Sequence, residues 1–251
     1  GSWHPVQAVY HRYLAWLRSQ DVPYMNRMPG ATCLWSLRSG RMGTVGRPIN
    51  TRKGCGGVMR VAPAGLAFPP GQAFRYGVDF AAITHGHPSG YLPAGVLADV
   101  IARVLDGGGL RDSVAGTLAE LRGCAGHGET LDAVTRALDL ACSQTSPDEA
   151  IARLGPGWVG EEALAVALFC ALRSESDWEH GVLLAVNHSG DSDSTGSITG
   201  AILGALLGFE ALPAPWVAQL ESNAGIATVA GDLYRVVREG AEPLSPLYDQ
   251  G

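Results

Sequence analysis

Most of the chain consists of apolar stretches whose hydrophobic residues recur every three or four positions, separated by short polar turns. That spacing places the hydrophobic residues on one face of a helix. It predicts helices over residues 4–20, 72–84, 89–105, 110–122, 130–143, 147–154, 161–173, 178–187, 194–209, 215–221 and 224–239. The alternating pattern typical of β-strands is scarce. We therefore predict an all-α protein, a single compact multi-helix bundle.

Two of these helices have patterns that place them near the centre of the bundle. Residues 161–173 are apolar on almost every side, which is typical of a buried helix. In the helix over 194–209, glycine recurs every four residues, at Gly196, Gly200, Gly204 and Gly208. Each glycine costs a helix about 1 kcal/mol relative to alanine, so we expect a compensating gain. Close approach of another helix to a face without Cβ atoms would supply it.

Residues 23–57 differ from the rest, because they are rich in Gly, Pro, Arg, Asn and Ser and show weak periodicity. A plain linker is one interpretation. A functional loop is the one we favour, because loops on a rigid scaffold commonly carry sites and this segment ends in a glycine-rich motif.

Composition narrows the class of protein. The chain has 24 acidic and 18 basic residues, a net charge of −6, which makes nucleic acid an unlikely partner. Hydrophobic residues make up 46% and charged residues 17%, which excludes a disordered chain. The longest apolar run, residues 198–209, is shorter than the roughly 20 residues of a membrane span. Five cysteines without a CxxC pair indicate reduced, buried thiols. We expect a cytoplasmic protein with no membrane partner.

The first motif that carries chemistry is Asp191-Ser192-Asp193-Ser194, at the start of a predicted apolar helix. In a turn that enters a helix, alternate residues can point to the same side, so the two carboxylates and the Ser194 hydroxyl can converge. Hard cations such as Mg²⁺ or Mn²⁺ prefer such oxygen ligands. Helix capping by Asp193 or Ser194 is the simpler interpretation, but it accounts for only one acid. We favour a metal site.

The second motif, residues 53–63, contains Gly54, Gly56 and Gly57. A glycine-rich turn can present backbone N–H groups to a phosphate, although a plain tight turn explains the pattern equally well. The third motif lies between two predicted helices and contains His85, His87, Ser89, Gly90 and Tyr91. Two histidines could bind zinc, but no further ligand follows at a suitable spacing. A polar substrate-binding loop fits these donors and acceptors better.

Three segments resemble the ADP-ribosylglycohydrolase family in their order and spacing. They are KGCGGVMRVAP (53–63), THGHPSGYLPA (84–94) and SGDSDSTGSITGAILGA (189–205). The resemblance implies an all-α fold and a site with two Mg²⁺ or Mn²⁺ ions. It also implies hydrolysis of the glycosidic bond at the ribose C1″ of an ADP-ribosylated protein or a small ADP-ribosyl compound. By position, Asp191, Asp193 and Ser194 resemble the metal ligands, with Asp191 and Asp193 the catalytic pair.

The same resemblance assigns substrate binding to the other two motifs. Gly54, Gly56 and Gly57 resemble the family's substrate loop, and Ser89, Gly90 and Tyr91 resemble the segment that cradles ADP-ribose. We include His85 and His87 with them as binding residues, because they lie in the same polar loop. Cys55 is a departure, because many members have asparagine there.

Family members normally begin with a helix carrying a Gly-Asp-Ala-like motif, followed by a Thr-Asp-Asp metal motif, and the sequence of 251 residues contains neither. We expect a single domain over residues 1–251 that lacks the family's first helices. The sequence therefore leaves two hypotheses: a metal-dependent ADP-ribosyl hydrolase, or a non-catalytic relative that binds ADP-ribose-like ligands or is structural. It does not place a general acid.

Overall fold

The computed structural model describes residues 4–244, and within them the protein is built from α-helices joined by short loops. The helices are α1 Pro5–Ser19, α2 Ala31–Arg38, α3 Ala62–Ala67, α4 Gln72–Ala82, α5 Pro88–Leu105, α6 Leu110–Arg122, α7 Gly128–Cys142, α8 Pro147–Leu154, α9 Gly160–Leu172, α10 Trp178–Val186, α11 Ser192–Leu207, α12 Ala214–Gln219 and α13 Asn223–Tyr234. The described part has no β-strand, and two isolated β-bridges are its only extended pairings. The predicted all-α fold is confirmed.

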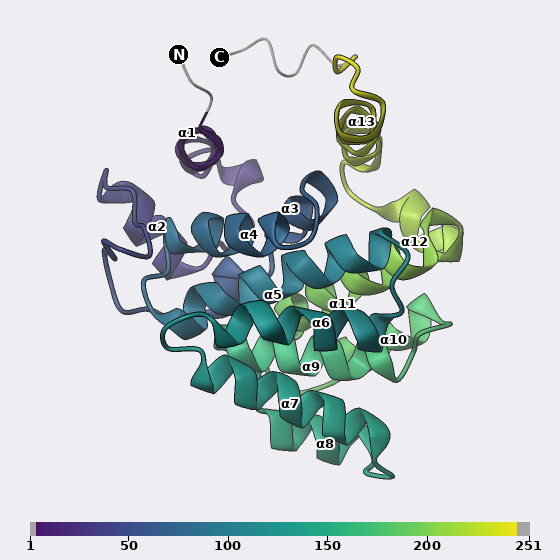
Figure 1. Cartoon of the computed structure of the whole chain (residues 1–251). Coiled ribbons are helices and arrows are strands. Elements are labelled where there is room, and N and C mark those ends of the chain that lie inside the picture. The colour runs from purple at the N-terminus through teal and green to yellow at the C-terminus, as the bar shows by residue number, and fades with distance from the viewer. Residues whose placement is uncertain (1–3, 245–251) are drawn as a thin grey trace.

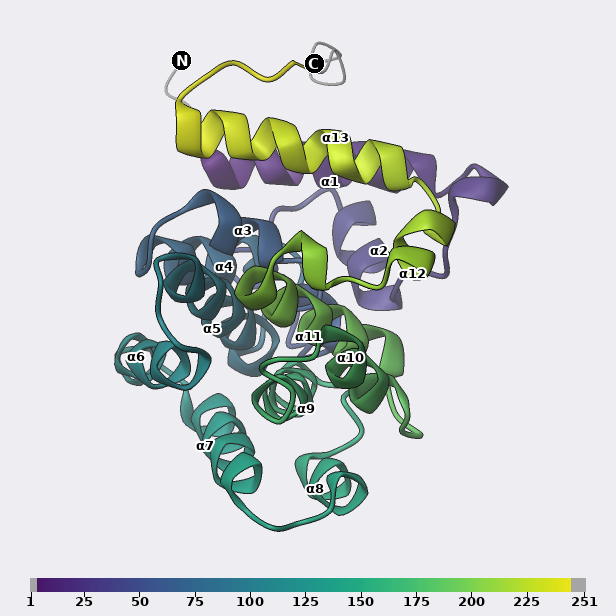
Figure 2. The ribbon, with the colours of Figure 1, turned by 90° about the vertical axis from the view of Figure 1, so that its right-hand side faces the viewer.

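Helices α5, α9 and α11 form the centre of the bundle and pack on one another. Helices α3, α4 and α6 cover α5, whereas α7 and α10 cover α9 (Figures 1 and 2). Helices α1 and α13 lie at the same end of the molecule and are separated in the view of Figure 1. A groove of about 700 Å³ lies between α1, α3 and the C-terminal segment, which here means residues 233–237. Its lining is mainly apolar and includes Val9, Phe68 and Val236.

The central position predicted for the helix over 161–173 is confirmed. In α9 every residue except Glu162 is buried, and Phe169 is among the largest fully buried side chains. Helices α4 and α5 approach each other closely at Gly77, where a Cβ atom would lie 2.6 Å from the carbonyl oxygen of Ala94. Small residues in these helices therefore set how tightly the core packs.

The glycine stripe of α11 receives α10, as predicted. A Cβ atom at Gly196 would lie 2.5 Å from Val186 Cγ1, and one at Gly200 would lie 3.3 Å from the Trp178 ring. The Trp178 indole N–H also donates to the Gly200 carbonyl at 3.1 Å. Gly208 has a different role, because it follows the end of α11 with φ +80°, a conformation that ends helices and favours glycine.

The structure differs from the sequence prediction in four places, one of which is the short helix α3, where no helix is predicted. Residues 23–57 are not a continuous loop, since they contain α2, which buries Cys33 and Leu37 on one side. Helix α2 follows Gly30 without a side-chain cap and has no acid in its first turn, so the local signals that mark the start of a helix are missing. The helix predicted over 224–239 is α-helical only to Tyr234 and continues as a π-helical turn, Arg235–Glu239. Cys142, expected to be buried, is exposed at the end of α7.

In the part of the chain that the structure describes, no helix has the length and apolar character needed to cross a membrane.

Candidate functional site

Two of the predicted motifs, far apart in the sequence, meet at Asp191. Cys55 lies in a 3₁₀ turn, Cys55–Gly57, and Asp191 occupies the N-cap position of α11. The Cys55 thiol donates to Asp191 Oδ2 at 2.6 Å, and its Sγ lies 3.4 Å from Ser194 Oγ. The Asp191 side chain makes no capping bond to the helix. Capping therefore does not explain this acid. Its carboxyl is held instead by Cys55 of the second motif, whose residues 53–57 form the glycine-rich loop.

The local electrostatics disfavour a second negative charge beside Asp191. Burial, followed by the neighbouring Asp193 carboxyl, raises the pKa of Asp191 above its ordinary value. Burial and the bond to Asp191 raise the pKa of the Cys55 thiol to about 12, so the thiol stays protonated at neutral pH and can donate. Asp193 is exposed, whereas Asp191 and Ser194 are buried. The turn thus holds one enclosed and one open carboxylate next to each other.

This donor set suits a divalent cation in part. Two adjacent carboxylates and a hydroxyl are hard oxygen ligands, and a cation between the acids would relieve their mutual repulsion. Across residues 4–244, however, no group of three or more His, Cys, Asp or Glu side chains is placed to hold a metal ion. The described residues therefore offer one side of a cation site, which is too few carboxylates for two ions.

A loop that the sequence analysis missed joins the two motifs. The carbonyl of Pro156 accepts the Asp191 N–H at 2.8 Å, and the carbonyl of Trp158 accepts the Cys55 N–H at 3.2 Å. A Cβ atom at Gly190 would lie 1.9 Å from the Pro156 oxygen, so only glycine fits there. The repeated glycines at 155, 157 and 160 could have marked this loop as structurally demanding.

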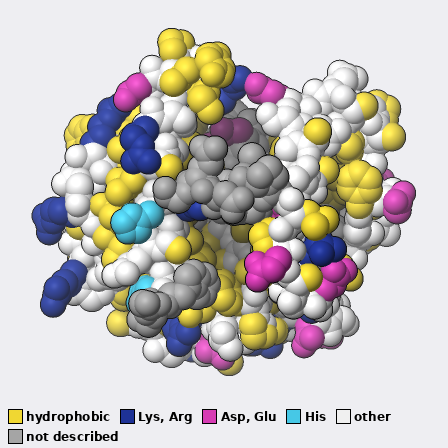
Figure 3. All heavy atoms as spheres, turned by 90° about the horizontal axis from the view of Figure 1, so that it is seen from above, with side chains coloured by type: hydrophobic (Ala, Val, Ile, Leu, Met, Phe, Trp, Pro, Cys, Tyr) yellow, Lys and Arg dark blue, Asp and Glu magenta, His cyan; other side chains and the backbone are white. Residues whose placement is uncertain are grey.

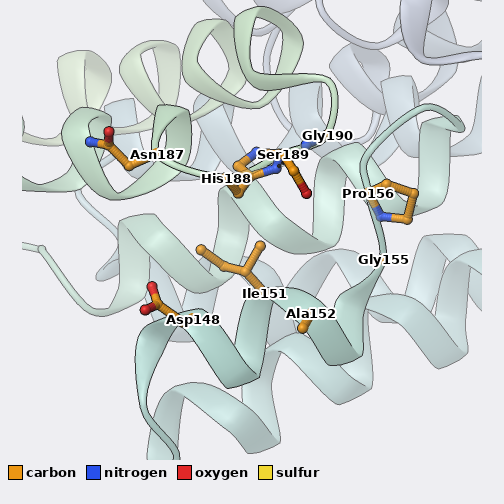
Figure 4. Close-up of a pocket in the computed structure, with 9 residues that line it drawn as sticks. All are labelled: Asp148, Ile151, Ala152, Gly155, Pro156, Asn187, His188, Ser189 and Gly190. Atoms are coloured by element: carbon orange, nitrogen blue, oxygen red, sulfur yellow. Dashed lines mark hydrogen bonds between the residues drawn. The ribbon is translucent and has the colours of Figure 1, made fainter.

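The turn before Asp191 is held by a histidine and borders a pocket of about 370 Å³ (Figure 4). His188 Nδ1 accepts the Gly190 N–H at 3.1 Å, and His188 Nε2 lies 3.0 Å from Thr195 Oγ1. In Figure 4 the turn lies across from Ile151 of α8, on the far side of the pocket. With both ring nitrogens engaged inside the turn, His188 fixes the backbone that leads to the acids.

On its other side the glycine-rich loop packs onto the third motif. A Cβ atom at Gly57 would lie 2.6 Å from the Gly90 carbonyl, and one at Gly56 would lie 3.4 Å from His85 Cε1. Close packing therefore requires glycine at position 57, whereas Gly56 is tightly surrounded and a Cβ atom at Gly54 would meet its neighbours at ordinary van der Waals distances. His85 is buried beneath them, with Nδ1 2.8 Å from Thr84 Oγ1. Burial, helped by the Arg60 charge, lowers the pKa of His85 to about 3, so its ring is neutral at pH 7.

The remaining residues of the third motif begin α5. His87 is the N-cap of α5, and its ring accepts the Ser89 N–H at 3.1 Å. Ser89, Gly90 and Tyr91 are buried, and the Ser89 hydroxyl donates to Glu129 of α7 at 2.5 Å. The glycine-rich loop thus contacts both of the other motifs, with the acids on one side and the third motif on the other. The roles assigned to individual residues by resemblance stay predictions.

Comparison with known proteins places this architecture. The sequence matches the ADP-ribosylglycohydrolase family over residues 1–243. A search of curated proteins finds no match. Among solved structures, one named "ADP-ribosylglycohydrolase-related protein complex" is similar, with 25% sequence identity and a TM-score of 0.65, over 94% of this chain and 82% of that one. The family match covers nearly the whole chain and agrees with the fold, and the chain belongs to the ADP-ribosylglycohydrolase family.

Proposed function

We propose that this protein binds ADP-ribosyl groups and, with a divalent cation, hydrolyses the glycosidic bond at the ribose C1″. The family is one of glycoside hydrolases that act on ADP-ribosylated substrates. The observation that carries the finer proposal is the turn at Asp191. There a buried carboxylate, an open carboxylate and a hydroxyl lie together, and the buried one is bonded to the glycine-rich loop.

Asp191, Asp193 and Ser194 would hold the cation, Mg²⁺ or Mn²⁺. When bound, the cation would orient the ribose hydroxyls and lower the pKa of a water ligand. The Cys55 thiol, which donates to Asp191 Oδ2, keeps that carboxylate in one orientation. The backbone of Gly54–Gly57 and the first turn of α5 would bind the rest of the ADP-ribose.

A fixed geometry is what this chain contributes most clearly to such a reaction. The backbone on both sides of Asp191 is bonded, to Pro156 through the Asp191 N–H and to Thr195 through the Asp191 carbonyl. Positioning of this kind accounts for a large part of catalysis when reacting groups must be held in one arrangement. The acids are thus set in place before a substrate arrives.

The test combines binding with turnover. We expect titration calorimetry to show binding of Mg²⁺ and ADP-ribose, and an assay with an ADP-ribosylated peptide to show release of ADP-ribose. Asp193→Ala should abolish both the Mg²⁺ binding and the release. Asp148→Ala, in the first turn of α8 at the pocket of Figure 4, is the matched control and should retain both. Absence of binding to either ligand in the wild-type protein would exclude the proposal.

A non-catalytic ADP-ribose-binding protein is the second candidate. It is favoured by one observation, that the described residues supply only part of a cation site. In that case ADP-ribose should bind without added Mg²⁺ and with equal affinity to wild type and Asp193→Ala, and no ADP-ribose should be released from the peptide.

A further inference from the structure

Lys53, at the start of the glycine-rich loop, lies in a cluster of hydrogen bonds with the first turns of α5, α7 and α9. Lys53 Nζ donates to Glu129 Oε2 of α7 at 3.1 Å and to Glu161 Oε1 of α9 at 2.9 Å. The same Glu129 oxygen accepts the hydroxyl of Ser89, in the first turn of α5, at 2.5 Å. Acids are favoured at these positions by the partial positive charge of helix N-termini. The ammonium group therefore joins α7 to α9, and Glu129 extends the cluster to α5.

The backbone of Lys53 is fixed at the same point. Its carbonyl accepts the Gly160 N–H at 2.8 Å, and its Cα would lie 3.1 Å from a Cβ atom at Gly90. Two residues later the Cys55 N–H is bonded to Trp158, and the Cys55 thiol is bonded to Asp191. A shift at Lys53 would thus be transmitted directly to the contact between the loop and the buried acid.

The two acids of this cluster differ in how much they depend on Lys53. The Glu161 side chain is 9% exposed, and within the described residues its Oε2 is buried without a hydrogen-bond partner. Glu129 is about half exposed and also accepts the Ser89 hydroxyl. The hydrogen bonds to Glu161 and then Glu129 raise the pKa of Lys53, so it is charged at neutral pH. Loss of that charge would leave Glu161 buried and unpaired, which is strongly unfavourable.

We propose that Lys53 is a positioning residue of the substrate site: its ion pairs with Glu129 and Glu161 hold the glycine-rich loop against Asp191 and keep the Ser89 hydroxyl turned toward Glu129. The substrate part of this inference rests on the proposed function, and the positioning part does not. An ordinary surface ion pair would contribute little to stability and would act only locally. Lys53 is expected to act on backbone bonds that lie several residues away.

Hydrogen exchange tests the positioning directly. The variants are Lys53→Met, which removes the charge, Lys53→Arg, which keeps it, and Glu129→Gln, which leaves Lys53 paired with the buried Glu161. Arg153→Met, which breaks the exposed ion pair of Arg153 with Glu149 on α8, is the matched control. In Lys53→Met we expect the amides of Cys55 and Gly160 to exchange at least about tenfold faster, with Lys53→Arg close to wild type.

Glu129→Gln keeps the test decisive if Lys53→Met does not fold. It should give a smaller rise in exchange at the same two amides, together with a rise at Ser89, because only one of the two ion pairs is weakened. Unchanged exchange in Lys53→Met, a uniform rise along the chain, or failure of arginine to restore protection would each overturn the proposal. An equal rise at these amides in Arg153→Met would do so as well.

Calorimetry with ADP-ribose adds the functional arm. If the loop binds substrate, Lys53→Met should weaken ADP-ribose binding about tenfold, which corresponds to about 1.4 kcal/mol, and Lys53→Arg should recover most of the affinity. Wild-type affinity in Lys53→Met would overturn the role in substrate binding. If the wild-type protein does not bind ADP-ribose, the proposed function fails, and the exchange pattern alone decides whether Lys53 positions the loop.

Discussion

Helices α9 and α13 have similarly apolar sequences and opposite environments. All but one residue of α9 is buried, and the helix packs against α5, α7 and α11. In α13 the one residue buried within the described part is a polar one, Asp232, whereas Ile226 and Val229 are about half exposed. Helix α9 lies inside the bundle and α13 lies at its surface (Figure 2). Apolar composition thus predicts a helix in both cases and its burial in only one.

The difference lies in the neighbours. Helix α9 has partners on every side, whereas α13 lies next to the apolar groove that separates the C-terminal segment from α1 and α3. Seen from above, this end of the molecule displays several groups of hydrophobic side chains among polar ones (Figure 3). The protein therefore has a tightly packed half that carries the candidate site and a loosely packed outer layer. Substitutions in the two regions should therefore change the free energy of unfolding by different amounts.

The largest difference is expected from truncating one apolar side chain in each helix. Phe169→Ala in α9 should lower the free energy of unfolding by about 3–5 kcal/mol, because it leaves a cavity in a close-packed core. Ile226→Ala in α13 should change it by less than about 0.5 kcal/mol, as surface substitutions do. Urea denaturation followed by circular dichroism measures both. Similar losses in the two variants would show that α13 is buried in solution.

An intermediate effect is expected from the pH dependence of the packed half. Folding lowers the pKa of His85 to about 3 from an ordinary 6.5. Between these pH values the imidazole binds a proton in the unfolded state and stays neutral in the folded state. The contribution of His85 to the free energy of unfolding is fully present above about pH 6.5 and is lost as the pH falls toward 3. Between pH 6.5 and 4.5 this group should cost about 2 kcal/mol. His85→Gln should remove that part of the slope, and an unchanged slope would mean that His85 is not buried neutral.

Two glycine substitutions, one in α11 and one in α13, are expected to change the free energy of unfolding in opposite directions. Gly196→Ala in α11 would bring a Cβ atom 2.5 Å from Val186 Cγ1 and should destabilise the protein by about 1–3 kcal/mol. Gly231→Ala in α13 meets no atom within 4 Å and should stabilise it by about 0.4–1 kcal/mol. Thermal denaturation of the pair gives the answer. Destabilisation by Gly231→Ala would indicate close packing around α13.

Much of the fold follows from local patterns. The periodicity predicts eleven of the helices with ends within about two residues in most cases, because long apolar faces and the Pro and Gly residues that flank them are local signals. It misses α2 and α3, which are eight and six residues long. Length alone is not the reason, because α8 has eight residues and is predicted: Ser146, Pro147 and two acids mark its start, whereas α2 and α3 have neither a side-chain cap nor an acid in the first turn.

The candidate site was predicted in its parts and missed in its connections. The acids at Asp191 and Asp193 stand out because two carboxylates at a helix start exceed the needs of capping. Nothing local to Lys53 or Glu129 predicts that they meet, since 76 residues separate them. The glycines of the loop at 155–160 are visible in the sequence, but which backbone groups they allow to approach is not.

The sequence by itself determined most of the helical segments and the family that the chain resembles, and it predicts which residues carry the chemistry, because these depend on residue type and local spacing. Only the tertiary structure decided that the Cys55 thiol bonds to Asp191, that His85 is buried and neutral, and that Lys53 links α7 to α9. It also decided that α9 is enclosed and α13 is not. Burial and long-range hydrogen bonds depend on which segments become neighbours, and that is a property of the whole folded chain.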